Sequence, residues 1–245
     1  MSELPILGVL LGNSAGVGPE LVAKLAVSNY YADYCRPVII GDVRMFEHGL
    51  KVVGGDVSHY VISDLSECDW ERGYPVLDLK DQDPEQVVYG EANAYCGASD
   101  LLQLDTAIEL CKAGKIEGFV FGPFHKGAMK MAGLHDESEH TYLAHAFNLT
   151  TPFCEVNMMD DLMTVRTTSH IPISEVSANI TEQTLREAIE LGEITGESFG
   201  HKPRIAVAAL NPHCGEFGLC GREEVDVIQP TIEKVVKETG WNVSG

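Results

Sequence analysis

The chain has 245 residues, 44% of them hydrophobic, which is enough for one large domain or for two smaller domains that share a cleft. Its 37 acidic and 17 basic residues give a formal net charge of −20. Because so acidic a surface repels nucleic acid and anionic membranes, we expect neither as a partner.

Short apolar runs alternate with segments of helical periodicity along most of the chain. Up to residue 121, the pattern predicts strands at 5–11, 37–41, 59–63, 86–89 and 116–121, and helices at 18–28, 43–50 and 97–113. Beyond residue 121, we expect a short helix that ends near residue 132 and further helices at 141–147, 181–196 and 223–238. We also expect strands at 153–158, 161–167 and 204–210. Such βα alternation predicts an α/β fold with a mostly parallel sheet and helices on both faces.

Neither the N-terminus nor the cysteines suggest export. The apolar run at the N-terminus is too short for a signal peptide or a membrane span, and no other stretch approaches the roughly 18 apolar residues of a span. The seven cysteines are scattered and include no Cys-x-x-Cys pair, which is typical of thiols in a reducing compartment. We therefore expect a cytoplasmic protein.

The first candidate motif is a glycine-rich turn, Gly12–Glu20 (GNSAGVGPE), between the first strand and the first helix. Backbone N–H groups in such a turn can bind an anion at the N-terminus of the helix. The spacing is not G-x-G-x-x-G, so the dinucleotide-binding fingerprint is not met. A tight structural turn is the alternative interpretation.

The second candidate is Gly122–Gly127 (GPFHKG), which follows the strand predicted at 116–121. Lys126 lies just beyond the carboxyl end of that strand, where ligands bind in open α/β sheets. The alternative is an exposed lysine in a turn.

Three histidines, His140, His170 and His213, each lie at or just after a predicted strand end among small polar residues. Because the ends of parallel strands converge on one edge of a sheet, we expect the three to form one polar site. Neutral imidazole is a common ligand of divalent metals. Structural hydrogen bonding by three separate histidines is the alternative.

These segments resemble signature blocks of the 4-hydroxythreonine-4-phosphate dehydrogenase (PdxA) family. Gly12–Glu20 is similar to its G-D-P-A-G-[IV]-G-P-E block, and Gly122–Gly127 to its G-P-[VIL]-[HN]-K block. His140-Thr141, Thr168–His170 and Leu210–Glu216 (LNPHCGE) are similar to its G-H-T-E, T-T-H and L-N-P-H-A-G-E blocks. Their order agrees, and the likeness runs over essentially the whole chain.

The resemblance implies a fold like that of isocitrate and isopropylmalate dehydrogenases, with two α/β domains around a cleft. We expect these domains to span residues 1–120 and 121–245, the second carrying the metal histidines. The resemblance also implies a homodimer with sites at the subunit interface, NAD or NADP, and a divalent metal such as Zn, Mg, Mn or Co.

Carried over residue by residue, the resemblance assigns His170 and His213 to the metal, and His140 and Thr141 to the substrate. The third metal histidine of the family belongs to a later Y-H-D-Q-type block, which would lie beyond Gly245, so we expect the C-terminal part of the family fold to be absent.

Within the Gly122–Gly127 block, we expect Lys126 and His125 to be the catalytic residues. The implied reaction is oxidation of a 3-hydroxy acid, such as 4-phosphohydroxy-L-threonine, with hydride transfer to the nicotinamide and subsequent decarboxylation.

The chain departs from the signature beside the expected site. Asn13-Ser14 replaces Asp-Pro, Glu139 replaces the glycine before His140, and Tyr142 replaces the glutamate after Thr141. These changes leave the substrate open among the phosphates of hydroxythreonine, threonate and erythronate and the cyclic dihydrodiol carboxylates, so a role in pyridoxine biosynthesis does not follow.

Two other functions remain as alternatives. A truncated member of the family could be a catalytically inactive metal- or ligand-binding protein, because two imidazoles alone bind a divalent metal weakly. A metal-dependent hydrolase could use the same histidines and would need no nicotinamide.

Overall fold

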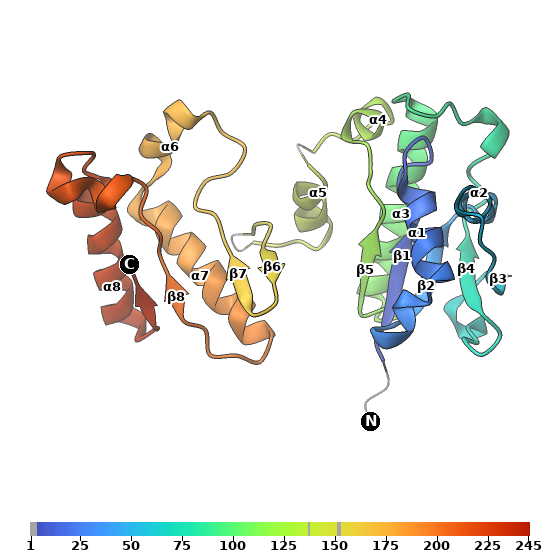
Figure 1. Ribbon diagram of the computed structural model, residues 1–245, viewed down its shortest axis with the longest axis horizontal. Helices are drawn as coiled ribbons and strands as arrows, with labels where there is room; N and C mark the ends of the chain where they lie inside the picture. The colour runs from blue at the N-terminus through green and yellow to red at the C-terminus, as the bar shows by residue number, and fades with distance from the viewer. Residues whose placement is uncertain (1–3, 137, 151–152) are drawn as a thin grey trace. The chain divides into compact units, whose positions relative to one another are not determined.

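The computed structural model describes residues 4–136, 138–150 and 153–245 (Figure 1). The chain divides into two compact units, Met1–Asn148 and Leu149–Gly245. We had expected a boundary at residue 120. In the structure, the strand that ends at Phe121 belongs to the first sheet, and the helix that follows it packs in the same unit.

Unit 1 is built on a five-stranded, wholly parallel sheet in the order β3-β4-β2-β1-β5. Its strands are β1 (Ile6–Leu10), β2 (Arg36–Gly41), β3 (His59–Ile62), β4 (Tyr74–Asp78) and β5 (Gly118–Phe121). The short apolar runs of β1 and β2 are almost fully buried, as expected for strands covered on both faces.

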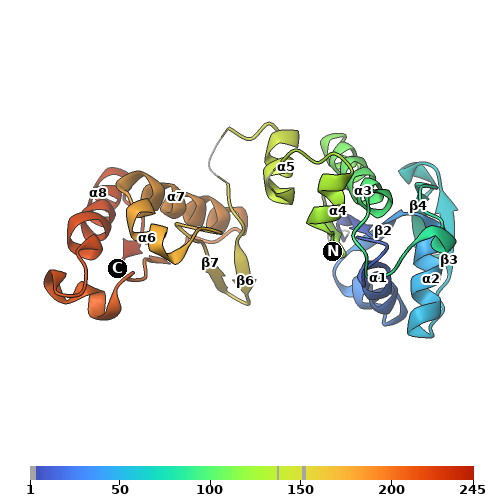
Figure 2. The same ribbon diagram turned by 90° about the horizontal axis from the view of Figure 1, so that it is seen from above.

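The helices of unit 1 cover both faces of this sheet (Figure 2). They are α1 (Gly18–Val27), α2 (Val43–Val53), α3 (Ala94–Lys112), α4 (Lys126–Met131) and α5 (Glu139–Ala146). Val9 and Ile39 face a core that includes Phe46 of α2, whereas Leu10 and Ile40 face a core that includes Leu104 and Ile108 of α3 and Met129 of α4. This alternation along β1 and β2 is the period-2 pattern of a strand buried on two sides.

One predicted strand of unit 1 was wrong and one real strand was not predicted. Of residues 86–89, Gln86 ends a short 3-10 helix, Pro84–Gln86, and the rest form a loop, in which Val87 is buried. The missed strand is β4, which contains Pro75. Proline argues against a central strand because it has no N–H to donate to the sheet.

Unit 2 contains less sheet than expected. β6 (Asn157–Met159) and β7 (Leu162–Thr164) form an antiparallel hairpin, and β8 (Ile205–Ala206) pairs in parallel with β9 (Val243–Ser244). The helices are α6 (Ile173–Asn179), which was not predicted, α7 (Glu182–Ser198) and α8 (Gln229–Thr239), which directly continues a π-helical turn at Glu224–Ile228. α7 and α8 pack through an apolar core formed by Leu185, Ile189, Ile228, Ile232 and Val235.

No helix in the described ranges is both long and apolar enough to cross a membrane.

Candidate functional site

The carboxyl edge of the parallel sheet in unit 1 contains a topological switch point. The chain leaves β1 through α1 toward β2 on one side, whereas β5, on the other side of β1, leads into α4 on the opposite face. In open α/β sheets, ligands bind where the two neighbouring loops diverge in this way. The two loops here are the two glycine-containing motifs of the sequence, residues 11–17 and 122–125.

Backbone packing explains the glycines of these loops. A Cβ at Gly12 would lie 2.6 Å from the carbonyl carbon of Gly122, and a Cβ at Gly18 would lie 2.3 Å from the Leu11 carbonyl oxygen. The loops are also joined by the Asn13 N–H, which donates to the Pro123 carbonyl over 2.9 Å. This contact supports the interpretation of the first motif as a structural turn.

Two buried polar residues of α3, Asp100 and Gln103, make hydrogen bonds to these loops. Asn13 donates from Nδ2 to Asp100 Oδ2 over 2.7 Å, and the His125 N–H donates to the same oxygen over 3.2 Å. Gln103 accepts from the Gly12 N–H and donates back to the Gly12 carbonyl, over 3.0 and 3.2 Å. Burial raises the pKa of Asp100 to about 7, although the bonds from Asn13 and His125 oppose the shift.

Lys126 and His125 lie at the start of α4. His125 is the N-cap of this helix, and its Nδ1 accepts from the Ala128 N–H over 3.1 Å, so the neutral ring carries its proton on Nε2. The Lys126 side chain is 48% exposed, and its Nζ lies 3.8 Å from Glu139 Oε2.

His140 and Thr141 lie in the first turn of α5, which Ser138 caps by accepting from the Thr141 N–H. Thr141 Oγ1 is also 2.8 Å from Ser138 Oγ, and His140 is exposed. Because Glu139 pairs with Lys126, unit 1 brings the expected substrate-contacting helix turn next to the expected catalytic lysine.

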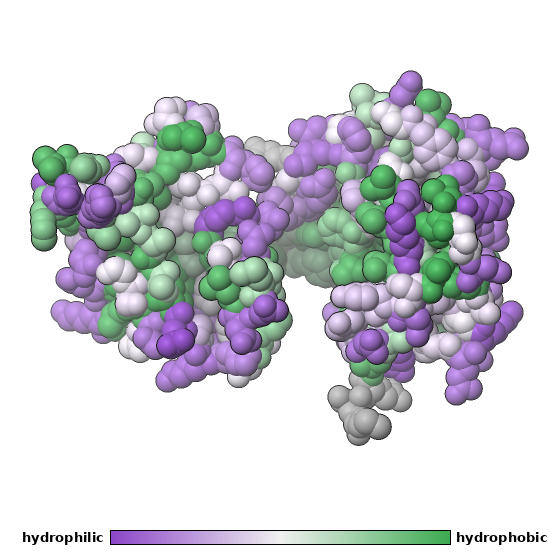
Figure 3. Space-filling view, viewed as in Figure 1, coloured by the Kyte–Doolittle hydropathy of each residue, from purple (hydrophilic) through white to green (hydrophobic). Residues whose placement is uncertain are grey.

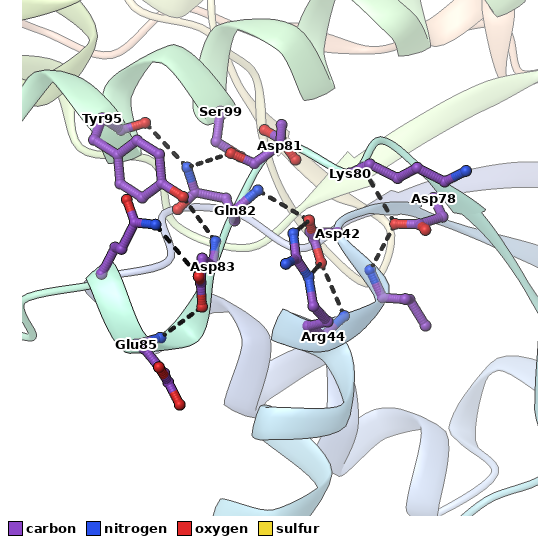
Figure 4. Close-up of polar contacts among 12 residues, drawn as sticks. Asp42, Arg44, Asp78, Lys80, Asp81, Gln82, Asp83, Glu85, Tyr95 and Ser99 are labelled. Carbon is purple, nitrogen blue, oxygen red and sulfur yellow. Dashed lines mark hydrogen bonds and ion pairs between the residues drawn. The ribbon is translucent and has the colours of Figure 1, made fainter.

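Two other carboxylates at this edge of the sheet, those of Asp42 and Asp78, have structural partners (Figure 4). Asp42 caps α2 and accepts from the Arg44 guanidinium and from the Gln82 N–H, over 2.7 to 2.9 Å. Burial raises the pKa of Asp42, but these hydrogen bonds outweigh it and hold the pKa below its usual value. Asp78 accepts from the N–H groups of Val43 and Lys80. These bonds tie the ends of β2 and β4 together.

The two expected metal histidines lie in unit 2, and both have left-handed backbone conformations. His170 has φ +57° and follows β7, and His213 has φ +53° after β8. Both are exposed, and neither ring makes a hydrogen bond within the described part of the chain. Left-handed conformations of residues other than glycine are uncommon, and strained backbone clusters at functional sites.

His213 begins five consecutive left-handed residues, His213–Phe217. Glu224 holds the start of this turn: its Oε1 accepts from the N–H groups of Leu210 and Asn211, over 3.0 and 2.7 Å, and its Oε2 accepts from Asn211 Nδ2 over 2.9 Å. The motif Leu210–Glu216 therefore has an unusual left-handed backbone, anchored at its start by Glu224, and the His213 side chain on it is exposed.

The three histidines do not follow the ends of neighbouring parallel strands, which was the basis for expecting them in one polar site. His140 begins a helix, β7 pairs antiparallel with β6, and β8 belongs to a separate two-stranded sheet, so no single sheet edge carries all three. In the described ranges, no three side chains of His, Cys, Asp or Glu are arranged to hold a metal ion.

Comparisons with known proteins extend over nearly all of this chain. The family model of the pyridoxal phosphate biosynthetic protein PdxA matches residues 33–245. A Pseudomonas aeruginosa protein, provisionally named a 4-hydroxythreonine-4-phosphate dehydrogenase, is 34% identical over 99% of this chain and 72% of its own length. D-threonate 4-phosphate dehydrogenase of Bordetella bronchiseptica is 31% identical over 97% of this chain and 68% of its own length. The crystal structure of a 4-hydroxythreonine-4-phosphate dehydrogenase from Burkholderia phymatum matches with a TM-score of 0.82 and 32% identity. The match covers 100% of this chain and 74% of the Burkholderia chain.

Proposed function

This chain belongs to the PdxA family, and from that membership we propose that it is a dehydrogenase that uses NAD or NADP to oxidise the hydroxyl group of a phosphorylated hydroxy acid. The substrates named for its relatives, 4-hydroxythreonine 4-phosphate and D-threonate 4-phosphate, are the two leading candidates. Both are anions with a free hydroxyl group on C3, the β carbon relative to the carboxylate.

The observation that carries this proposal is the pairing of Lys126 with the first turn of α5. The ammonium group lies 3.8 Å from the Glu139 carboxylate, in the same helix turn as His140 and Thr141. An ammonium group and the N–H groups at a helix N-terminus both attract a phosphate or a carboxylate. We therefore assign substrate binding to Lys126, His140 and Thr141.

His170 and His213 are suitable ligands for a divalent metal, because both rings are exposed and free of hydrogen bonds within the described residues. When bound, such a metal acts as a Lewis acid on the substrate oxygen. We propose that decarboxylation follows when oxidation yields a β-keto acid. The His125 ring, whose Nδ1 is used by the cap of α4, has its Nε2–H left to donate to the substrate.

The proposal is tested by incubating the chain with each phosphorylated acid, NAD or NADP, and Mn²⁺, Mg²⁺, Zn²⁺ or Co²⁺, and following the absorbance of the reduced nicotinamide. We expect reduction that depends on both substrate and metal, and release of CO₂ where the product is a β-keto acid. Dephosphorylated D-threonate is the matched control and should react poorly. If no hydroxy acid reduces either cofactor under any of these conditions, the proposal is overturned.

Replacing Glu139 with glutamine is expected to lower the KM for a phosphorylated substrate about threefold to tenfold. The carboxylate neutralises Lys126 and repels the phosphate, and a partly exposed ion pair of this kind contributes about 1 kcal/mol. Steady-state kinetics would measure the change. The part of the effect that acts through the ion pair should vanish in a Lys126→Ala background, which leaves only the direct repulsion of the phosphate by Glu139.

The matched control for Glu139→Gln is Glu109→Gln, which breaks a similar surface pair with Lys112 at the far end of α3. It should leave KM unchanged. An equal fall of KM in both variants would mean that overall charge, rather than the Lys126 pair, is responsible.

We also propose that the protein is a homodimer in the cytoplasm. Unit 2 carries large apolar side chains that are almost wholly exposed and lie close in sequence to the two expected metal histidines: Ile173, Phe217 and Leu219 are 92%, 99% and 80% exposed. Figure 3 shows hydrophobic surface, in green, over α6 and over the segment that follows β8. The exposure of these side chains supports a partner surface, because apolar patches of this kind are usually covered. All seven cysteines are free thiols, which supports a reducing compartment.

A further inference from the structure

A single buried carboxyl group joins the two loops of the switch point. Asp100 has no exposed surface, and its Oδ2 accepts from the side chain of Asn13 in one loop and from the backbone of His125 in the other. Its Oδ1 accepts no hydrogen bond from the described residues. The carboxyl group therefore makes both of its bonds to the segments that border the candidate site.

The two loops depend on Asp100 to different degrees. The loop after β1 is also held by Gln103, which makes two bonds to the Gly12 backbone. The loop after β5 is also held by backbone bonds from the Gly122 N–H to the Leu10 carbonyl and from the Asn13 N–H to the Pro123 carbonyl, but neither of them reaches the His125 end of the loop. Loss of the Asp100 carboxyl should therefore release mainly the loop that carries His125 and Lys126.

We propose that Asp100 is a positioning residue, which sets the place of Lys126 by holding the His125 N–H at the start of α4 against the loop after β1. The inference rests on the proposed function in one respect, namely that Lys126 contacts the substrate. The hydrogen bonds and their effect on the loop do not depend on it.

The charged surroundings of Asp100 make its protonation, and with it the stability of the fold, depend on pH. Asp100 faces Asp81 from the loop after β4, Glu139 from α5, Cys96 from its own helix and the backbone of His125. Burial, together with Asp81 and Glu139, raises the pKa of Asp100 to about 7. Because two donors occupy Oδ2, the proton of the neutral acid has room on Oδ1, and both bonds survive protonation.

The sign of the pH effect on stability follows from this raised pKa. Below about pH 4, the carboxyl is protonated in both the folded and the unfolded chain and contributes no pH dependence. Between about pH 4 and pH 7, the folded chain keeps a proton that the unfolded chain has lost, so stability falls as pH rises. Above about pH 7, Asp100 is ionised in the folded chain as well, and the buried charge lowers the free energy of unfolding by its full amount.

The decisive comparison is between Asp100→Asn and Asp100→Ala. The amide oxygen of Asp100→Asn can take the place of Oδ2 and accept from both donors, whereas Asp100→Ala removes the acceptor. We expect amide hydrogen exchange of residues 122–128 to accelerate at least about tenfold in Asp100→Ala and to stay near the native rate in Asp100→Asn. We expect kcat/KM to fall about 100-fold in Asp100→Ala, as for a reactive group misplaced by about 1 Å, and to recover in Asp100→Asn.

Urea unfolding at about pH 5.5 and about pH 8 supplies the second measurement. The midpoint of the native chain should fall relative to that of Asp100→Asn as pH rises, because the substitution removes the buried charge. Asn13→Asp should be destabilised most at about pH 8, where two carboxylates face each other, and adding Asp100→Asn should reverse that loss.

Two results would overturn the proposal. One is a native rate of amide hydrogen exchange for residues 122–128 in Asp100→Ala. The other is an equal acceleration of exchange and an equal loss of kcat/KM in Asp100→Asn and Asp100→Ala. Failure of the proposed function is separate from both, because a chain that reduces no nicotinamide would still show whether hydrogen exchange and the pH-dependent midpoint respond to Asp100.

Discussion

Replacing His213 with alanine is expected to lower turnover about 1000-fold and to weaken the binding of Mn²⁺, Co²⁺ or Zn²⁺ at least about tenfold. A metal that polarises the substrate oxygen stabilises the transition state by several kcal/mol, and about 4 kcal/mol corresponds to a factor of 1000 in rate. His213 is exposed on a left-handed turn that Glu224 holds in place, so its truncation leaves the fold intact. Isothermal titration and steady-state kinetics would measure the two effects.

His170→Ala should reproduce both losses, because each variant removes one of the two imidazoles assigned to the metal in unit 2. The matched control is His201→Ala, which removes another exposed imidazole of the same unit. It should bind metal and turn over like the native chain. Native metal affinity in both His170→Ala and His213→Ala would remove these residues from the metal site, whatever the activity.

The parallel sheet of unit 1 could be predicted because its strands are buried on both faces. Buried strands appear in the sequence as continuous apolar runs, such as residues 5–11 and 37–41, and the structure places strands at Ile6–Leu10 and Arg36–Gly41. The α/β class and the mostly parallel sheet followed from these runs and from the helices between them. β4 was missed because Pro75 interrupts a run of only five residues.

The strands of unit 2 were overestimated for a different reason. Apolar runs at 153–158, 161–167 and 204–210 satisfy the same pattern, but in the structure each pairs over three residues or fewer. Apolar runs report burial, whereas pairing depends on partners far away in the chain. Sequence periodicity therefore could not show that His170 and His213 follow strands of different sheets.

Among the site residues, Asp100 and Gln103 were missed even though the sequence held a signal for them. Leu104 and Ile108 define the buried stripe of α3, and the same stripe continues toward the N-terminus through Gln103, Asp100 and Cys96. Polar residues on the buried face of an amphipathic helix need hydrogen-bond partners. The interruption of the stripe was therefore a signal for a buried polar contact, but it could not identify the partners, which belong to loops far away in the sequence.

Replacing Gly97 with alanine is expected to destabilise unit 1 by about 3 kcal/mol, because α3 and α4 meet there through their backbones. A Cβ at Gly97 would lie 2.0 Å from the carbonyl oxygen and 2.2 Å from the carbonyl carbon of Ala128, and neither atom belongs to a flexible side chain. The two helices must separate to accept the methyl group. Since α4 begins at Lys126, we also expect the candidate site to lose activity.

Gly192→Ala is the matched control, since this glycine also lies inside a long helix, α7, but a Cβ there would make ordinary contact, 3.4 Å from an Ile205 side-chain atom. Alanine at Gly192 should stabilise the chain by about 0.5–1 kcal/mol through its higher helix propensity. Urea unfolding would measure both variants, with Trp70 reporting on unit 1 and Trp241 on unit 2. A gain in stability for Gly97→Ala similar to that for Gly192→Ala would show that α3 and α4 are further apart than described, and that Lys126 does not depend on their contact.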